Sequence, residues 1–532
     1  MHKNTTESLP IVFLSYCVVL ALVYAAALYA SYAFYDDYPV LYKAQHNAWF
    51  GELFKYFEVN TPVAKKDVGE LEHDISNGRP FMGAYFYIVF QFLSPAIASL
   101  AWLRFFALIG LVLFSSLLFL WLKRHRWPSW TACALPCCIA CSPPFIVYVA
   151  WATCSFFPFG AFLAGLSYVC LERWRKDNQW LWLVLSIALL WVSLGIYQPT
   201  AMMFWLFAAV RWLSFARFDQ SSMKSIGVDV AVAFLALVLA YLAFVKGLPN
   251  LLDIAPSVRS ALVTQPLQKL WWFINGPLPM SAHSWFTLKP SPWLGFLLVL
   301  FGFVGLWFKT GVREALLRNV LWIGLILLSA LPSLVIDENA SNYRQYAALT
   351  AVLWLGLGHA VSELKAHHLN RFFAGCKGFA LGQWIMVCLA VWSAVMASYR
   401  TLHYFAIPAI REKELMAAAL RKAHAQDARH LYLKAAPNVG PVQGSSEEFG
   451  YSISSQHPYN FLSMISFLWK KQYPNEPIHI HVDPSPLKIM DYQATASHYQ
   501  WITIEPFPSH APANGVLLDA GKIVGEAWAM DF

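Results

Sequence analysis

Residues 11–34 read IVFLSYCVVLALVYAAALYASYAF, and residues 35–47 continue as YDDYPVLYKAQHN. The first stretch is apolar and supplies the roughly 20 residues that a membrane-spanning helix needs. A cleavable signal peptide has an apolar core of only about 7–15 residues, so we interpret residues 11–34 as a retained first span. Two adjacent carboxylates, Asp36 and Asp37, follow it at the predicted membrane surface.

The composition predicts a polytopic membrane protein. Of the 532 residues, 58% are hydrophobic and 13% are charged, and the mean hydropathy is +0.47. A soluble protein cannot bury so much apolar surface, whereas a bundle of spans exposes it to the lipid bilayer. The net charge of +8 is dispersed over short loops, so nucleic acid is not an expected partner.

Further apolar runs bring the predicted total to about 11 membrane helices. They are 100–122, 129–150, 156–171, 180–196, 200–214, 226–245, 292–308, 319–336, 345–362 and 379–398. We interpret residues 81–99 as an interfacial or re-entrant helix, because a full span there would invert every later loop. The predicted fold class is therefore an α-helical polytopic membrane protein.

Basic residues indicate the orientation, since they gather in alternate short loops. By the positive-inside rule, these loops and the N-terminus are cytoplasmic. The extracytoplasmic side then receives the first loop 35–80, a second large loop 246–291, the link 337–344 and everything after about residue 399. The basic loops are 123–126, 173–176, 211–224, 309–318 and 365–377.

We expect two domains, a transmembrane domain at 1–399 and a C-terminal extracytoplasmic domain at 400–532. The second is large enough for a small core of its own. Its pattern predicts an α/β domain, with helices at 410–424 and 459–471 and strands at 430–433 and 478–482. All nine cysteines lie in or beside apolar stretches, so no disulfide framework is expected.

The acidic pair is the first candidate for chemistry. Glycosyl transfer needs a carboxylate that takes the proton from an incoming hydroxyl group, and a second acid can orient the acceptor or raise the pKa of the base. Adjacent side chains point in different directions, so at most one of Asp36 and Asp37 is the base. The alternative is that both are solvated acids at a helix end.

Other candidates for substrate binding lie on the predicted outer side. Arg79 opens a helix at Asn77-Gly78-Arg79-Pro80 and either pairs with the acids or a phosphate, or is an interfacial arginine. Tyr197 and Gln198 lie in a polar corner at 193–200, which either hydrogen-bonds a sugar or turns a helical hairpin.

The later outer segments contribute the remaining candidates. Arg344 is a candidate for a lipid phosphate, and Tyr346 lies beside it. Lys246 and His283 are candidates in the long loop, whose other basic residues, including Lys269, we expect to be mostly surface charges.

No metal or other cofactor is predicted, although a divalent metal stays open. Cys137, Cys138 and Cys141 lack a second ligand pair at a zinc-like spacing. A minor alternative is a metal at His479, His481 and Asp483, which alternate along a predicted strand. The sequence contains no nucleotide-binding fingerprint, so a transferase would take a membrane-borne donor.

Three motifs together resemble a known family. They are Tyr35-Asp36-Asp37-Tyr38, Gly78-Arg79-Pro80 and Leu194-Gly195-Ile196-Tyr197-Gln198. They are similar to motifs of the GtrII-type O-antigen glucosyltransferases of bacteria and their phages, which belong to the GT-C class of polytopic membrane glycosyltransferases. The resemblance covers residues 10–400.

The resemblance implies that a sugar, often glucose, moves from a polyprenyl-phosphate carrier to lipid-linked O-antigen. The reaction would take place at the periplasmic face of the bacterial inner membrane. On this chain the base would be Asp36 or Asp37, and Arg79 and Arg344 would bind the carrier phosphate. Where the resemblance would lead one to expect a basic residue after the acids, this chain has Tyr38, Pro39 and Val40, which makes phosphate recognition more dependent on Arg79 and the later loops.

Two other functions stay open on the sequence. A transporter or flippase of a lipid-linked saccharide would carry charged residues within its spans and inverted repeats, and neither is evident. Arg104 begins a long span, and we expect it to reach the membrane surface. An O-antigen polymerase would also have large outer loops, but it would join whole repeat units.

Overall fold

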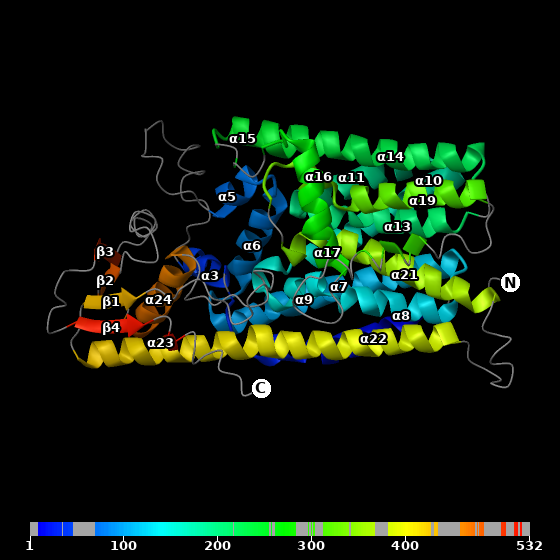
Figure 1. Cartoon of the computed structure of the whole chain (residues 1–532). Coiled ribbons are helices and arrows are strands. Elements are labelled where there is room, and N and C mark those ends of the chain that lie inside the picture. The colour runs from blue at the N-terminus through cyan, green and yellow to red at the C-terminus, as the bar shows by residue number, and fades with distance from the viewer. Residues whose placement is uncertain are drawn as a thin grey trace.

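The computed structural model describes residues 9–34, 36–45, 70–215, 218–254, 257, 261–282, 296, 299–300, 302–303, 312–339, 342–367, 381–426, 430–434, 458–473, 476, 478–482, 502–506, 515–519 and 522–523. This part of the chain is mainly helical (Figure 1). Four of its helices are long and apolar enough to cross a membrane, and a fifth is present if the bent pair Ser129–Ala140 and Pro143–Ala150 counts as one span. Several long apolar helices indicate a multi-pass membrane protein.

Helices follow one another through the first 213 residues. They are α1 (Leu9–Val23), α2 (Ala25–Tyr29), α3 (Asp37–Gln45), α5 (Glu70–Ser76), α6 (Pro80–Phe92), η1 (Ile97–Ser99), α7 (Leu100–Arg124), α8 (Ser129–Ala140), α9 (Pro143–Ala150), η2 (Ala152–Cys154), α10 (Phe157–Asp177), α11 (Trp180–Ile196), α12 (Gln198–Ala201) and α13 (Met203–Leu213).

The rest of the chain adds helices and four short strands. They are α14 (Gln220–Ala240), η3 (Tyr241–Gly247), α15 (Leu248–Leu251), α16 (Pro266–Asn275), α17 (Pro277–Ala282), α19 (Val312–Ser329), α20 (Leu331–Val335), η5 (Tyr343–Tyr346), α21 (Ala347–His367), α22 (Leu381–Arg400), η7 (Thr401–Ala406), α23 (Ile407–Ala425), β1 (His430–Lys434), α24 (Pro458–Gln472), β2 (Ile478–Val482), β3 (Ile502–Pro506) and β4 (Gly515–Asp519). Both η3 and η7 are π-helical.

The predicted apolar runs are mostly helical in the described residues, but several are broken or short, and the first run is not helical beyond Tyr29. The run 129–150 becomes α8 and α9, bent by 56°. Pro143 and Pro144 begin α9, and a proline disfavours helical geometry in the residue before it. The first run divides between α1 and α2 at Tyr24. Most of the run 292–308 lies outside the described residues, and the total of about 11 spans stays a prediction.

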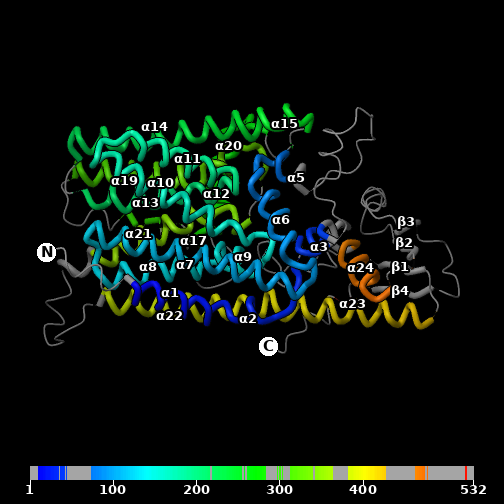
Figure 2. Tube along the Cα trace, turned by 180° about the vertical axis from the view of Figure 1, so that it is seen from behind, coloured from blue at the N-terminus to red at the C-terminus, as the bar shows by residue number. Residues whose placement is uncertain are grey.

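One helix crosses the direction of the bundle, and another continues beyond the bundle. Figures 1 and 2 both show α6 crossing the direction of the long helices, in the segment that we interpret as interfacial or re-entrant. α22 passes through the π-helical η7 into α23, so one helix of 44 residues, Gly382–Ala425, carries the chain across the predicted domain boundary at 399/400. That boundary stays a prediction.

The four strands form one parallel sheet in the order β3-β2-β1-β4. β1 and β2 fall on the predicted strands, and α23 and α24 fall on the predicted helices. The sheet, α24 and α3 lie at the same end of the bundle (Figure 1). The side chains at 462–469 of α24 are all buried, because α3 and α23 both pack against this helix. The C-terminal part therefore contacts the helix that carries Asp37.

Candidate functional site

Asp37 begins α3 and is fully buried. Its carboxylate accepts hydrogen bonds from the backbone N–H of Phe34 at 2.9 Å and of Thr153 at 3.0 Å. The guanidinium of Arg104 lies 3.3 Å from the same carboxylate. A buried carboxylate needs such donors to offset the loss of water. For Asp37, the alternative of a solvated helix-end acid is therefore wrong.

Asp36 has a different environment, because its side chain is only partly buried. The neighbouring Asp37 is fully buried. A base has to reach the hydroxyl group of an incoming substrate. Of the two acids, Asp36 is the one with exposed surface.

Arg104 holds Asp37 from the start of α7. Its Nε donates to the carbonyl of Ala150 at 3.0 Å, and its Nη2 donates to the carbonyl of Tyr32 at 2.8 Å. The guanidinium carbon also lies 3.6 Å from the centre of the Tyr32 ring. Arg104 is fully buried among protein groups, so the interpretation as an arginine that snorkels along lipid is wrong. The ion pair joins α7, the end of α9 and the segment that leads to the acids.

The connection between α9 and α10 links Asp37 to Arg344. Ala150 and Thr153 bind Arg104 and Asp37 as described above, and Trp151 lies between them in the sequence. The guanidinium of Arg344 lies 4.7 Å from the centre of the Trp151 ring, a cation–π distance. Tyr346, also in η5, is fully buried. Arg344 and Asp37 thus contact neighbouring residues of one connection, and Trp151 in it was not among the residues that the sequence singled out.

Two predicted motifs meet at the start of α6. The Gln198 side chain donates to the carbonyl of Gly78 at 2.8 Å, and the Arg79 guanidinium lies 5.8 Å from the centre of the Tyr197 ring. Gly195 allows close packing in the same corner, since a Cβ there would lie 2.6 Å from the Phe81 ring. Tyr197 and Gln198 thus support the segment that presents Arg79, and Arg79 is only partly buried.

A stack of aromatic rings connects this corner to Arg344. Tyr197 stacks on Phe157 with ring centres 4.1 Å apart, and Phe157 meets Tyr148 edge-on at 5.2 Å. The Tyr148 hydroxyl donates to the carbonyl of Arg344 at 2.5 Å. Both candidate phosphate ligands are therefore attached to the start of α10 and the end of α9.

Gly78 is the residue of this corner with the strictest backbone requirement. Its φ is +70°, and a Cβ would lie 3.2 Å from Gln198 Nε2. We expect Gly78→Ala to destabilise the protein by about 1–2 kcal/mol, the usual cost of left-handed backbone for a residue with a Cβ. The measurement is the thermal unfolding midpoint in detergent. Gly227→Ala is the matched control, because a Cβ there has no neighbour within 4 Å in the described part, and an equal loss in both variants would contradict the assignment.

Lys246 and His283 are the two remaining candidates, from the long loop 246–291. Lys246 is exposed in η3, next to Val245, whose side chain would lie 3.3 Å from a Cβ on Gly78. His283 lies outside the described residues. Lys269 is 4% exposed and bonds to the link at 337–339, so the interpretation as a surface charge is wrong for it.

The described residues contain no group of three His, Cys, Asp or Glu side chains that is arranged to hold a metal. His479 and His481 lie on β2, paired in register with Thr503 and Glu505 of β3. Asp483 is outside the described residues, so the minor metal alternative stays untested.

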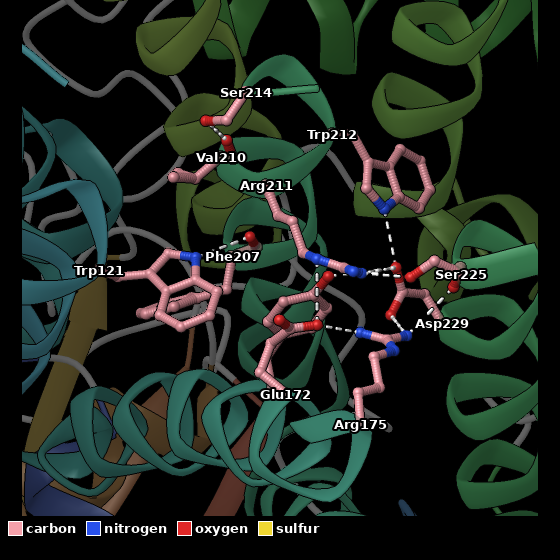
Figure 3. Close-up of polar contacts among 11 residues, drawn as sticks. Trp121, Glu172, Arg175, Phe207, Val210, Arg211, Trp212, Ser214, Ser225 and Asp229 are labelled. Carbon is pink, nitrogen blue, oxygen red and sulfur yellow. Dashed lines mark hydrogen bonds and ion pairs between the residues drawn. The ribbon is translucent and has the colours of Figure 1, made fainter. Parts of the chain in front are cut away.

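A second polar cluster joins α10, α13 and α14 (Figure 3). Asp229 of α14 is fully buried and accepts from the Trp212 indole at 2.7 Å and from the Tyr168 hydroxyl at 3.1 Å. It also pairs with Arg175, and Arg211 Nη1 lies 4.0 Å from its Oδ2. The sequence offered one signal for this cluster, an aspartate near the start of the apolar run 226–245.

The charges of this second cluster are mutually satisfied. Glu172 pairs with Arg175, and its Oε1 lies 3.1 Å from Arg211 Nε. Arg175 also donates to the carbonyl of Ser225 at 3.1 Å, and Arg211 donates to the Ser225 hydroxyl. Two arginines and two carboxylates sum to zero net charge. Such a network of ion pairs and hydrogen bonds connects the three helices α10, α13 and α14.

The two polar regions lie at opposite ends of α10. Phe157 begins the helix beside the Asp37 region, and Arg175 lies about 27 Å further along at a rise of about 1.5 Å per residue. The hydrocarbon core of a bilayer is about 30 Å thick. This spacing fits a helix with one polar region at each membrane surface.

Burial raises the pKa of Asp37 from 3.8 to about 6, although Arg104 and the two backbone N–H groups oppose the rise. Since folding favours the neutral form, the stability contributed by Asp37 is fully present below the unfolded value of 3.8 and is lost as the pH rises through about 6. We expect the thermal unfolding midpoint of the wild-type protein, measured relative to that of Asp37→Asn, to decrease as the pH rises from about 4 to about 7. A relative midpoint that rises with pH would contradict this sign.

No protein-family model matches this chain, and no curated protein is similar enough to be counted as a relative. The contacts of the Asp37 region are therefore the basis for proposing a function.

Proposed function

We propose that the protein is a membrane glycosyltransferase of the GT-C type. It moves a hexose, glucose in the GtrII-type resemblance, from a polyprenyl-phosphate carrier to lipid-linked O-antigen or another surface polysaccharide. In this proposal the chain has about 11 spans in the bacterial inner membrane, with the N-terminus cytoplasmic and the Asp37 region and C-terminal domain periplasmic. No nucleotide takes part.

The proposal depends on one observation. The acidic pair and two segments that each carry a partly buried arginine, Arg79 or Arg344, converge on the connection between α9 and α10. Trp151 and Thr153 of this connection contact Arg344 and Asp37 directly. Arg79 reaches the same region through Tyr197 and Phe157. An acid beside cations at a membrane surface suits a displacement in which a phosphate leaves.

The reaction assigns different roles to the two acids. Asp36 takes the proton from the acceptor hydroxyl while that oxygen attacks the anomeric carbon of the donor sugar. The bond between the anomeric carbon and the phosphate oxygen breaks, and the configuration at the anomeric carbon is inverted. Asp37 is a positioning residue, because its three contacts fix the start of α3 and so the place of Asp36.

Arg79 and Arg344 stabilise the leaving phosphate. Each guanidinium lies over an aromatic ring, Tyr197 or Trp151, and each side chain is only partly buried. A ring fixes the plane of the guanidinium, and a planar guanidinium can donate two parallel hydrogen bonds to a phosphate.

A transporter of a lipid-linked saccharide is the second candidate, favoured by the buried charges of Asp229, Arg175 and Arg211. Buried ionisable residues in a membrane protein often mark a transport path. In this cluster, however, each carboxylate has arginine partners, and the whole set fits a structural role equally well.

The test uses purified protein in vesicles with a polyprenyl-phosphate hexose and a lipid-linked oligosaccharide. Mass spectrometry of the acceptor is expected to show the addition of one hexose. Joined repeat units would indicate a polymerase. Movement of the lipid across the vesicle without a new glycosidic bond would indicate a transporter, and either result would contradict the proposal.

A further inference from the structure

The helix α16 exposes one apolar face in the part of the chain that the structure describes. Leu267, Leu270, Trp271 and Ile274 are 82%, 40%, 70% and 45% exposed. Their spacing is that of a single helix face, which would be costly to leave in water. Gln268 and Asn275 lie on its flank and are also exposed.

The opposite side of α16 is held by contacts with the rest of the protein. The apolar face is therefore not a core-packing face that became exposed by rotation of the helix. The Lys269 ammonium donates to the carbonyl of Glu338 at 2.7 Å and to the Asn339 side chain at 2.8 Å. It also lies 4.1 Å from the centre of the Trp272 ring. Rotation of the helix would break these contacts and leave the buried cation without partners.

The segment before α16 is fixed as well. Val263 N–H donates to the carbonyl of Val335 at 2.8 Å, and Asp337 N–H donates to the carbonyl of Ala261 at 2.8 Å. These bonds surround the isolated bridge between Leu262 and Ile336. The helix is therefore attached to α20 and to the link that leads to η5.

The direction of α16 identifies what covers its apolar face. Figure 1 shows α16 running across the direction of α14 and α19. A helix across the spans lies parallel to the membrane plane. α14 and η3, which continues it, expose apolar side chains to a similar degree, with Phe234 66% and Leu242 56% exposed. An amphipathic helix with tryptophan on its apolar face is typical of the membrane interface.

We propose that α16 lies in the membrane surface, with Leu267, Leu270, Trp271 and Ile274 in contact with lipid. The occupant is the bilayer itself, at the boundary between headgroups and acyl chains. Because Lys269 joins this helix to residues 338–339, membrane contact also holds the link that precedes Arg344. The proposal concerns a lipid surface and does not depend on the sugar-transfer reaction.

The experiment is electron paramagnetic resonance of the full chain in vesicles of phosphatidylethanolamine and phosphatidylglycerol. A nitroxide is attached through a genetically encoded ketone amino acid, which leaves all nine native cysteines in place. The probes are placed at Leu267, Trp271 and Ile274, with Gln268 and Asn275 as matched controls on the polar flank. All five positions are exposed, so the substitutions are expected to fold.

We expect collisions with oxygen to exceed collisions with a water-soluble nickel chelate at the three apolar positions, by a ratio severalfold higher than at the controls. High nickel access at Leu267 and Trp271 would place the face in water. Low access to both reagents there would indicate a protein contact, such as a second copy of the chain. Either outcome would overturn the proposal, whatever the result of the sugar-transfer assay.

Discussion

Asp36→Asn is expected to lower the rate of sugar transfer by about 10²–10⁴-fold, the usual cost of removing a general base. The amide keeps the shape of the side chain but does not accept the proton of the acceptor hydroxyl. Because Asp36 is partly exposed, the substitution should leave the unfolding midpoint unchanged. The measurement is the rate of hexose addition in vesicles at saturating polyprenyl-phosphate hexose.

Two variants complete this experiment. Asp253→Asn removes an exposed carboxylate from the predicted outer loop, and its backbone φ of 52° suits asparagine, so full activity is expected. Asp37→Asn should lower the unfolding midpoint, because an amide places a donor against the N–H groups or the guanidinium that now bind the carboxylate. Wild-type rates for Asp36→Asn would remove Asp36 as the base.

Asp229→Ala is expected to destabilise the protein by about 3–5 kcal/mol, because it leaves buried arginines without their partner. The variant also removes the acceptor of the Trp212 and Tyr168 hydrogen bonds. The thermal unfolding midpoint in detergent measures the loss.

The helix α10, which carries Arg175 of this cluster, offers a matched control. Asp177 pairs with Arg173 at 2.8 Å, but the two side chains are 37% and 59% exposed. An exposed ion pair contributes about 0–1 kcal/mol, so Asp177→Ala should have little effect. In the double variant Asp229→Ala with Arg175→Leu, part of the lost stability should return, since one unpaired cation is removed with the carboxylate. Equal effects of Asp229→Ala and Asp177→Ala would contradict a structural role for the second cluster.

Hydropathy predicts the helices well because membrane spans depend on local composition. The runs 100–122, 156–171 and 226–245 all fall within long helices of the structure. Hydropathy does not predict where a run bends, as at Pro143 between α8 and α9.

Contacts between distant segments were the part of the site that the sequence could not supply. The motifs at Gly78 and Gln198 are both visible in the sequence, but their hydrogen bond joins residues 120 positions apart. The pairing of Arg104 with Asp37 needs the packing of α7 beside the first segment. Periodicity gives the face of a helix and not its neighbour, so Arg104 looked like an interfacial arginine. The same reason hid the roles of Trp151 and Lys269.

The proposed site can be tested by a cryo-electron microscopy structure of the protein in lipid nanodiscs with a bound polyprenyl phosphate. We expect the phosphate within hydrogen-bond distance of Arg79 or Arg344, on the side of the bundle that holds Asp36. A phosphate bound instead at Arg175 of α10 and Arg211 of α13, in the second cluster, would contradict the proposed function.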